Sequence, residues 1–233
     1  MPRILLTNDD GIDGEGLRVL AQWSRTLGEI LVVAPKVEQS ATGQSIVLRR
    51  PIEVAESDRF SDLGVRAYTV DSTPADCVRF SVDRFGPFDF VLSGINRGMN
   101  VGYDIAYSGT CGAAFEANYA GLPSVAFSAK QGCFARAADE LDAIWTFLCS
   151  HGLFDRSMMW NVNIPAEPHG ILLTSQGSLF YRDHFIPCGD HLYRTETYIA
   201  YQAKKTDSPT LDVDAVSNGF CSVSPLTVDR TRR

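Results

Sequence analysis

The chain has 233 residues, of which 45% are hydrophobic and 21% are charged, and its formal net charge at pH 7 is −7. These values fit one large globular domain, or a core with a smaller appendage, and they argue against a nucleic-acid duplex as the partner, because proteins that bind one usually present a basic patch. The sequence contains no long apolar run, no secretory signal and no C-x-x-C motif among its six cysteines, so we expect a cytoplasmic protein with reduced thiols and no membrane partner.

Strand and helix patterns alternate through the first two thirds of the chain. Short apolar runs typical of buried strands are separated by segments in which apolar or small residues recur at helical spacing. The first helix is expected to end at Gly28, and a hydroxyl followed by proline, at Thr73-Pro74, predicts the start of another. Strands are expected at residues 4–6, 30–34, 46–48, 52–54, 67–70, 88–92 and 124–127, and helices at 17–27, from 73 onward, at 109–120 and around 141–148.

The pattern changes after Trp160. Residues 162–164 and 171–173 have the composition of extended segments, and residues 191–204 combine Tyr and Thr with a period of two, as in a hairpin arm. No helix is expected in this last third.

These patterns predict an α/β fold with a Rossmann-like, doubly wound and mostly parallel sheet. The catalytic core is expected to span residues 1–158. Residues 159–233 are expected to supply C-terminal strands that complete the core and a β-hairpin arm that mediates oligomerisation, because an exposed strand readily pairs with another subunit.

Two aspartates stand side by side at the end of the first expected strand, in Asn8-Asp9-Asp10-Gly11. Open α/β sheets place their ligand sites beyond the carboxyl ends of the strands, and a polar turn allows neighbouring side chains to converge. Two converging carboxylates repel each other unless a cation lies between them or one of them holds a proton. The pair therefore indicates either a divalent-metal site or a solvated acidic turn that caps the following helix.

Two further polar loops follow strands that should end at the same edge of the sheet. Ser40 lies after the second strand, and Asn96 lies after the strand expected at 88–92. Alone, Ser40 suits hydration or a cap, and Asn96 in a glycine-rich loop suits a turn. Together with the two aspartates they form an all-oxygen ligand set, which favours magnesium or manganese over zinc or copper.

A third loop, Ser108-Gly109-Thr110, precedes an expected helix. The first N–H groups of a helix have no partner within it, and together with the helix dipole they attract anions. The same residues also suit an ordinary N-cap. From these residues alone, an anion site and a structural cap both remain open.

Other catalytic patterns have less support in the sequence. The order of Gly11, Gly14 and Gly16 is G-x-x-G-x-G, whereas dinucleotide-binding loops have G-x-G-x-x-G. The four histidines lack i, i+4 metal spacing, and no G-x-S-x-G elbow is present for a serine hydrolase. A phosphatase that forms an aspartyl phosphate stays open as an alternative: it would want an Asp-x-Asp spacing, which Asp9-Asp10 does not provide, and trapping a covalent phosphoenzyme would support it.

Taken in order, these loops resemble the SurE family of stationary-phase survival proteins, which are 5'/3'-nucleotidases. The resemblance runs through nearly the whole chain and rests on the order of its motifs rather than on any one of them. The matching segments are LLTNDDG at 5–11, VAP at 33–35 with QS at 39–40, TPADCV at 73–78, SGINRGMNVG at 93–102, YSGTCGAA at 107–114, WNVNIP at 160–165 and GFCSVSPL at 219–226.

The resemblance implies a metal-dependent phosphomonoesterase that converts nucleoside 5'- and 3'-monophosphates to nucleoside and phosphate. One divalent ion, magnesium or manganese, would be held by Asp9, Asp10, Ser40 and Asn96, of which the two aspartates would also be catalytic. The phosphate would be bound by Asn96, Ser108, Gly109 and Thr110. The family's Rossmann-like core carries a C-terminal arm exchanged between subunits, which implies a homodimer or homotetramer.

Three segments depart from the family pattern. Ala41-Thr42-Gly43-Gln44 stands where Gly-x-Gly-His is usual, Gly14-Glu15-Gly16 stands where Ala-Pro-Gly is usual, and Leu211-Asp212 replaces a late Thr-Asp. The expected metal ligands are unaffected. The departures bear on the pocket for base and sugar, and hence on which nucleotide is preferred.

The expected mechanism needs a cation because a phosphomonoester carries a charge of about −1.5 to −2 and would be repelled by the two aspartates. We expect Asp9 or Asp10 to orient or deprotonate the attacking water, and the backbone of residues 108–110 to stabilise charge on the phosphoryl oxygens. The alternative is a catalytically inactive nucleotide-binding or assembly module of the same fold. Such a module would bind a mononucleotide without metal-stimulated release of phosphate.

Overall fold

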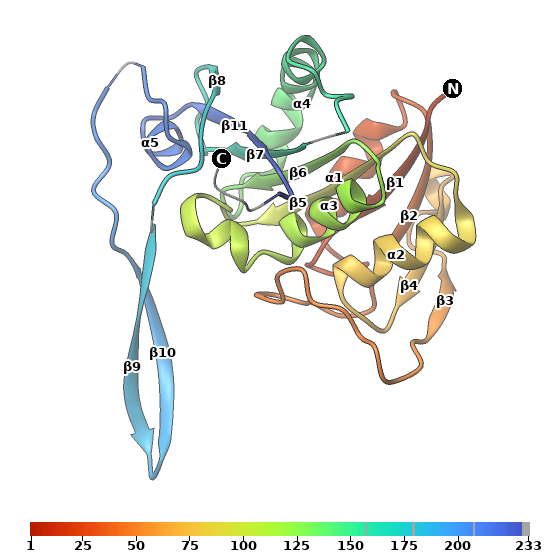
Figure 1. Ribbon diagram of the computed structural model, residues 1–233, viewed down its shortest axis with the longest axis horizontal. Coiled ribbons are helices and arrows are strands. Elements are labelled where there is room, and N and C mark those ends of the chain that lie inside the picture. Colours follow the sequence, from red (N-terminus) through yellow and green to blue (C-terminus); the bar gives the residue numbers. More distant parts are fainter. Residues whose placement is uncertain (157, 179, 207, 230–233) are drawn as a thin grey trace.

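The computed structural model describes residues 1–156, 158–178, 180–206 and 208–229. Within them, a nine-stranded sheet is covered by helices on both faces, and a two-stranded hairpin projects away from this body (Figure 1). The strands of the sheet are β1 (Arg3–Thr7), β2 (Glu29–Pro35), β3 (Val54–Ser57), β4 (Arg66–Val70), β5 (Phe90–Arg97), β6 (Ser124–Ala129), β7 (Met159–Ile164), β8 (Ile171–Leu173) and β11 (Cys221–Leu226). The hairpin consists of β9 (Tyr181–Gly189) and β10 (Leu192–Ile199). The helices are α1 (Glu15–Ser24), α2 (Pro74–Phe85), α3 (Gly109–Tyr119), α4 (Phe134–Ser150) and α5 (Asp212–Ser217), with 3-10 turns η1 (Ser61–Leu63) and η2 (Gly102–Ala106).

The strand order of the sheet is β3-β4-β2-β1-β5-β6-β7-β11-β8. β1 pairs in parallel with β2 on one side and with β5 on the other, whereas β3 and β11 each run antiparallel to a neighbour. The strands that follow β1 in the sequence, β2 to β4, lie on one side of it, and the later strands of the sheet lie on the other side. This is the α/β, doubly wound and mostly parallel architecture expected from the sequence. The reversal between β1 and β5 opens a crevice at the carboxyl ends of the strands, where such folds bind ligands.

The side chains of β1 explain why helices cover both faces of the sheet. Ile4 and Leu6 pack into the core cluster shared with α1 and α4, whereas Leu5 packs into the cluster shared with α2 and α3. Successive residues of a strand point to opposite faces, so a continuous apolar run needs cover on both.

Hydroxyl side chains cap two of the helices. The Thr73 hydroxyl accepts a hydrogen bond from the Asp76 N–H at 3.2 Å, and Pro74 is the first residue of α2. Ser108 caps α3 in the same way by accepting from the Cys111 N–H at 3.1 Å. Both helix starts agree with the sequence pattern, because a cap is a local interaction.

The strand expected at residues 46–48 does not form. The Val47 N–H donates instead to the Asp76 carboxylate at 2.8 Å, so the start of α2 takes up a backbone donor that a sheet would have used. The strand expected at 52–54 begins only at Val54.

β5 is longer than the strand expected at residues 88–92. It continues to Arg97, and Asn96 pairs with Ser128 of β6 after a shift in register. Asn96 therefore lies at the end of a central strand rather than in a free loop.

The first helix also differs from expectation, since α1 ends at Ser24 and not at Gly28. Gly28 serves another purpose: a Cβ at this position would lie 2.2 Å from the carbonyl oxygen of Pro2. Glycine thus permits the close approach of two backbone segments.

The C-terminal part of the chain completes the sheet with β7, β11 and β8 and adds α5, a helix that was not expected. Six residues are too few to show a helical period in the sequence. The Asp212 carboxylate at the start of α5 accepts hydrogen bonds from the N–H groups of Gly102 and Gly177, at 2.9 and 2.7 Å. Asp212 thereby ties α5 to η2.

The hairpin of β9 and β10 is the arm expected from the sequence, and it points away from the sheet (Figure 1). Its second strand falls within residues 191–204, and its first strand begins earlier, at Tyr181. Large apolar side chains on it are open to solvent, including Phe185 and Tyr193, which are 70% and 64% exposed.

Candidate active site

The polar loops at the carboxyl ends of β1, β2 and β5 meet in one cavity of about 260 Å³. All four expected metal ligands line it, namely Asp9, Asp10, Ser40 and Asn96, together with Ser108 from the expected phosphate site. The remaining lining residues are Glu38, Ala41, Arg97, Asn100, Asp104, Tyr107 and Tyr181. The structure thus brings together residues as far apart in the sequence as Asp9 and Tyr181.

Asp9 is the most enclosed acid of this cavity, with only 6% of its surface exposed. The Thr110 hydroxyl donates a hydrogen bond to Asp9 Oδ1 at 2.5 Å. Burial raises the pKa of Asp9 to about 6; the hydrogen bond from Thr110 opposes this shift, and the charge of Asp10 adds to it. Gly109 is close as well, since a Cβ on it would lie 2.9 Å from the Asp9 Cβ. Asp9 is therefore held firmly, in a place where its negative charge is poorly solvated.

Asp10 contacts the end of β5. Its carboxylate accepts a hydrogen bond from the Arg97 N–H at 3.1 Å, and the Arg97 guanidinium lies 3.9 Å from it. The same guanidinium lies 3.2 Å from Glu38. Burial raises the pKa of Asp10, and the hydrogen bond from the Arg97 N–H opposes that shift.

Ser40 and Asn96 each present an oxygen at the cavity. The Ser40 hydroxyl donates to Glu38 at 2.7 Å, which lowers the pKa of Glu38 and leaves the lone pairs of the hydroxyl oxygen for another contact. The Asn96 amide nitrogen donates to the Gly98 carbonyl at 2.9 Å, so its amide oxygen is the acceptor that remains.

These residues fit a hard divalent cation. Two carboxylates with raised pKa values lie in one cavity, and a cation would offset the charge that burial makes unfavourable. No group of three or more His, Cys, Asp or Glu side chains within the described parts of the chain could hold a metal ion. A cation here would therefore also need the oxygens of Ser40 and Asn96, and oxygen ligands suit magnesium or manganese.

Most polar groups at the start of α3 contact other parts of the protein. The Ser108 side chain is engaged with the Cys111 N–H, and Thr110 contributes its hydroxyl and its backbone N–H to Asp9. Thr110 and Gly109 are not among the residues that line the cavity. Of the four residues expected to bind phosphate, Asn96 and Ser108 line the cavity, whereas Gly109 and Thr110 lie against Asp9.

The family model described as Survival protein SurE matches residues 4–183. This chain belongs to the SurE family. Its relatives include 5'-nucleotidase SurE 1 of Thermus thermophilus, which is 37% identical over 234 residues and covers 98% of this chain and 93% of the relative. Another relative is 5'-nucleotidase SurE of Gemmatimonas aurantiaca. It is 39% identical over 245 residues, and the match covers 99% of this chain and 94% of the relative. The crystal structure of the SurE protein from Aquifex aeolicus matches with a TM-score of 0.83 and 35% identity, covering 99% of this chain and 95% of that one.

The departures from the SurE pattern lie in and beside the cavity. Ala41 is one of its lining residues, whereas the other positions of the three segments are not. Gln44, where histidine is usual, donates to Glu116 of α3 at 3.0 Å. Gly16 faces β5 so closely that a Cβ would lie 1.9 Å from the Ile95 carbonyl oxygen. Asp212 anchors η2, as described above. Gly16 and Asp212 are the positions of their segments that agree with the SurE pattern, and neither they nor Gln44 line the cavity.

A network of buried amides positions the loop after β5. The Asn100 N–H donates to the Asn163 side chain at 2.7 Å, and its amide donates to Ser128 at 2.9 Å. Its carbonyl oxygen accepts from the amides of Asn161 and Asn163, at 2.8 and 3.0 Å. The loop is therefore fixed to β6 and β7, which keeps Asn100 at the cavity wall.

Sequence analysis missed several residues of the site. Glu38 and Arg97 lie in or next to loops that were singled out, so their charge was a usable signal. Asp104 and Tyr107 precede the expected phosphate turn, and Tyr181 comes from the base of the arm. No local pattern marks Tyr181, because only the path of the chain brings it to the cavity.

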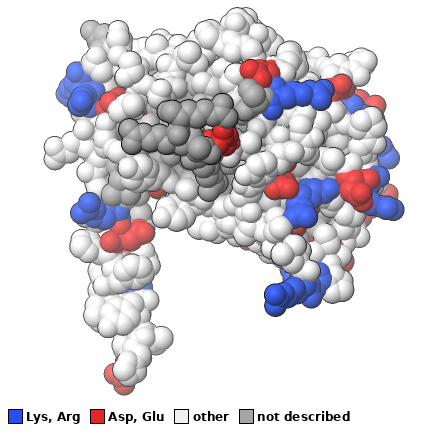
Figure 2. Space-filling model, viewed as in Figure 1, with Lys and Arg blue, Asp and Glu red and all other residues white. Residues whose placement is uncertain are grey.

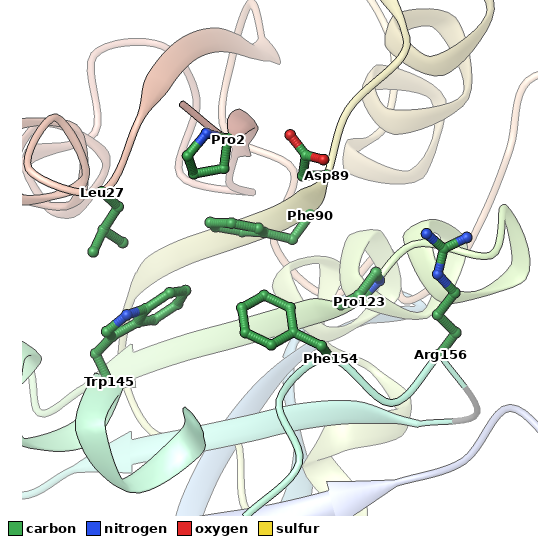
Figure 3. A pocket seen from close by; sticks show the side chains of 8 residues that line it. All are labelled: Pro2, Leu27, Asp89, Phe90, Pro123, Trp145, Phe154 and Arg156. Atoms are coloured by element: carbon green, nitrogen blue, oxygen red, sulfur yellow. The ribbon is translucent and has the colours of Figure 1, made fainter. Parts of the chain in front are cut away.

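A second hollow, of about 460 Å³, lies at the opposite end of the sheet, where β5 begins. Figure 3 shows the rings of Phe90, Trp145 and Phe154 around it. Its acidic group, Asp89, accepts a hydrogen bond from the Arg3 N–H at 2.6 Å and is thereby engaged in the fold. This hollow has the character of a packing gap between aromatic side chains and lacks the oxygen ligands of the first cavity.

The surface carries charges of both signs. On the face drawn in Figure 2, Lys and Arg side chains are interspersed with Asp and Glu rather than gathered in one continuous patch. Within the part of the chain that the structure describes, no helix is long and apolar enough to cross a membrane.

Proposed function

We propose that this protein is a divalent-metal-dependent phosphomonoesterase that releases phosphate from nucleoside 5'- and 3'-monophosphates. The observation that carries the proposal is a single cavity that joins the buried carboxylate of Asp9 and the half-buried carboxylate of Asp10 to the N-terminal end of α3. The names of the relatives from Thermus thermophilus and Gemmatimonas aurantiaca, both 5'-nucleotidases, support a nucleotide as the substrate.

Electrostatics makes a cation necessary for this reaction. A phosphomonoester carries a charge of about −1.5 to −2 at neutral pH and would enter a cavity that already contains Asp9, Asp10 and Glu38. The ion would be held by the carboxylates of Asp9 and Asp10 and by the oxygens of Ser40 and Asn96, all of which line the cavity. When bound, it supplies positive charge to the phosphate and lowers the pKa of a water at the site.

The protein's own groups then orient the reactants. Asp9 or Asp10 orients the attacking water and takes its proton, while the side chains of Ser108 and Asn96, which line the cavity, contact the phosphoryl oxygens. Backbone N–H groups at a helix start stabilise charge that develops there. The water oxygen bonds to phosphorus, the bond from phosphorus to the sugar oxygen breaks, and the sugar oxygen takes up a proton.

The test is phosphate release from a panel of nucleoside 5'- and 3'-monophosphates by protein stripped of metal with a chelator. We expect release to be negligible without added metal and to return with magnesium or manganese. Full activity after exhaustive chelation would contradict the metal dependence. Tight binding of a mononucleotide without any release of phosphate would instead indicate the catalytically inactive nucleotide-binding module.

We also propose that the arm joins copies of this chain into a homodimer or homotetramer. The exposed apolar side chains of β9 and β10, such as Phe185, Leu192 and Ile199, are the support, because an isolated hairpin is marginally stable in water. We place the activity in the cytoplasm, where the six free cysteines would stay reduced.

A further inference from the structure

Asp104 is an acid of the cavity that the proposed reaction does not use. It lies in η2, one turn before the start of α3, and lines the same cavity as Asp9 and Asn96. Its Oδ2 atom is enclosed, and no group in the described parts of the chain forms a hydrogen bond with it. A buried acceptor without a donor is unfavourable, so the fold itself leaves this carboxylate poorly stabilised. Because the residue lines the cavity, a bound molecule can supply hydrogen-bond donors to the part of the side chain that faces it.

The position of Asp104 relative to the phosphate turn is well defined. Its carbonyl oxygen accepts hydrogen bonds from the N–H groups of Tyr107 and Ser108, at 3.0 and 3.1 Å. η2 itself is anchored by Asp212, which accepts the Gly102 N–H. The backbone of Asp104 therefore has a fixed position relative to Ser108. A group bound next to Ser108 lies in the same cavity as the Asp104 side chain.

The chemistry of Asp104 excludes the phosphate as its partner. A carboxylate accepts hydrogen bonds and repels an anion, so it suits the hydroxyl groups of a sugar. Burial raises the pKa of Asp104 to about 6, and the nearby charges of Asp183 and Asp212 contribute to the shift. Hydroxyl donors would stabilise the ionised form against these effects.

Two aromatic residues of the cavity suit the rest of a nucleoside. Tyr107 follows Asp104 in the chain and is 65% exposed, and Tyr181 lines the same cavity from the start of β9. Aromatic rings stack on nucleobases and have little to offer a phosphate or a metal ion. Asp104, Tyr107 and Tyr181 thus form a part of the cavity whose chemistry differs from that of the metal and phosphate ligands.

We propose that Asp104 recognises the sugar of the substrate, and that its carboxylate accepts hydrogen bonds from the ribose hydroxyls and so favours ribonucleotides over nucleotides that lack them. This inference rests on the proposed nucleotidase function and deepens it. Asp104 is a specificity residue here, because it contacts the part of the substrate that does not react.

The experiment compares three substrates: AMP, 2',3'-dideoxy-AMP, and p-nitrophenyl phosphate, which has no sugar. For the wild-type protein we expect kcat/KM to be about 10- to 100-fold higher for AMP than for the dideoxy nucleotide, the range of a hydrogen bond to a charged group. Asp104→Ala should remove this preference by lowering kcat/KM for AMP alone. Asp183→Asn, which removes a nearby charge outside the cavity, is the matched control and should keep the preference.

Several outcomes would overturn the inference. Equal cleavage of AMP and the dideoxy nucleotide by the wild-type protein would show that the hydroxyls are not recognised. An equal loss on all three substrates in Asp104→Ala would indicate a role in shaping the phosphate turn, and a loss on both nucleotides alone would indicate proton transfer to the sugar oxygen.

Inhibition by nucleosides tests the role of Asp104 without a variant, and the choice of substrates separates this role from the proposed function. If Asp104→Ala does not fold, competitive inhibition of the wild-type protein by adenosine should still be stronger than inhibition by 2',3'-dideoxyadenosine, and equal inhibition would overturn the inference. Cleavage of p-nitrophenyl phosphate without cleavage of any nucleotide would refute the proposed function itself, whereas cleavage of both nucleotides at the same rate would refute only the role of Asp104.

Discussion

The Thr110 hydroxyl donates a hydrogen bond to Asp9 Oδ1 at 2.5 Å and so connects the first turn of α3 to the end of β1. The turn that sequence analysis singled out as a possible anion site therefore also holds the principal acid of the cavity. The hydrogen bond fixes the Asp9 carboxylate relative to the turn for which phosphate binding is proposed. This relationship leads to the first prediction.

Thr110→Val removes the hydroxyl while nearly keeping the size of the side chain. We expect the pKa of Asp9 in the metal-free protein to rise further above about 6, because the lost hydrogen bond favours the ionised form. The measurement is an NMR titration of the Asp9 carboxyl carbon. Thr110→Ser, which keeps a hydroxyl, should titrate like the wild-type protein; an unchanged titration in Thr110→Val would show that the hydroxyl does not stabilise the charge.

Asp9→Asn should abolish metal-stimulated release of phosphate from nucleotides while leaving a folded protein. Asparagine lacks the charge that holds the cation and cannot take a proton from water, so we expect kcat to fall by about 100-fold or more. Thermal unfolding should show a folded variant, because the substitution removes a buried charge. Asp58→Asn, an exposed aspartate outside the cavity, is the control. Wild-type kcat in Asp9→Asn would show that Asp9 has no role in catalysis.

The free energy of unfolding should fall as the pH rises from 4 to 6, in part because of Asp104. The pKa of Asp104 is about 6 in the folded protein, against 3.8 for an unperturbed aspartate as in the unfolded chain. The folded state therefore binds the proton more tightly than the unfolded state. Ionisation therefore favours unfolding, and the effect is complete above about pH 6. Asp104→Asn should be more stable than the wild-type protein at pH 8 and lose that advantage at pH 4. Urea unfolding at both values measures this, and a pH-independent difference would contradict it.

Gly16→Ala should destabilise the protein by about 1–3 kcal/mol, the range for overpacking in a filled interior. A Cβ at this position would lie 1.9 Å from the Ile95 carbonyl oxygen, so α1 would have to move away from β5. Urea unfolding gives the change in free energy. Glu15→Ala, at an exposed position in the same turn, should change it by less than about 0.5 kcal/mol. Equal stability of Gly16→Ala and the wild-type protein would show that the helix shifts without penalty.

Removal of the arm should give a monomer, because the proposed dimer or tetramer is joined through it. Tyr181 and Ile199 face each other at the base of the hairpin, so a two-residue Asn-Gly turn can replace residues 182–198 without disturbing the body. Light scattering of the full chain and of the shortened chain gives their masses. A full chain that is already monomeric, or a shortened chain with the same number of subunits, would refute the role of the arm.

Local sequence patterns were enough to predict the elements that form the framework of the site. The apolar run in β1, the hydroxyl cap at Thr73 and the polar turn at Asp9 and Asp10 follow from the sequence, and the cap at Ser108 was one of two alternatives that it left open. Each depends on residues close together in the chain: strand burial follows from an unbroken apolar run, and a cap follows from a side chain three residues from its donor. The order of the strands then placed the polar turns at one edge of the sheet.

Tertiary structure decided which side chains contact one another at that edge. β5 continues to Arg97 because β6 provides backbone partners, and Thr110 binds Asp9 because α3 packs beside the end of β1. Asp104 and Tyr181 reach the cavity only through the folding of η2 and of the base of the arm. Such contacts join residues far apart in the chain, and their energies depend on burial and geometry that no short window of sequence contains.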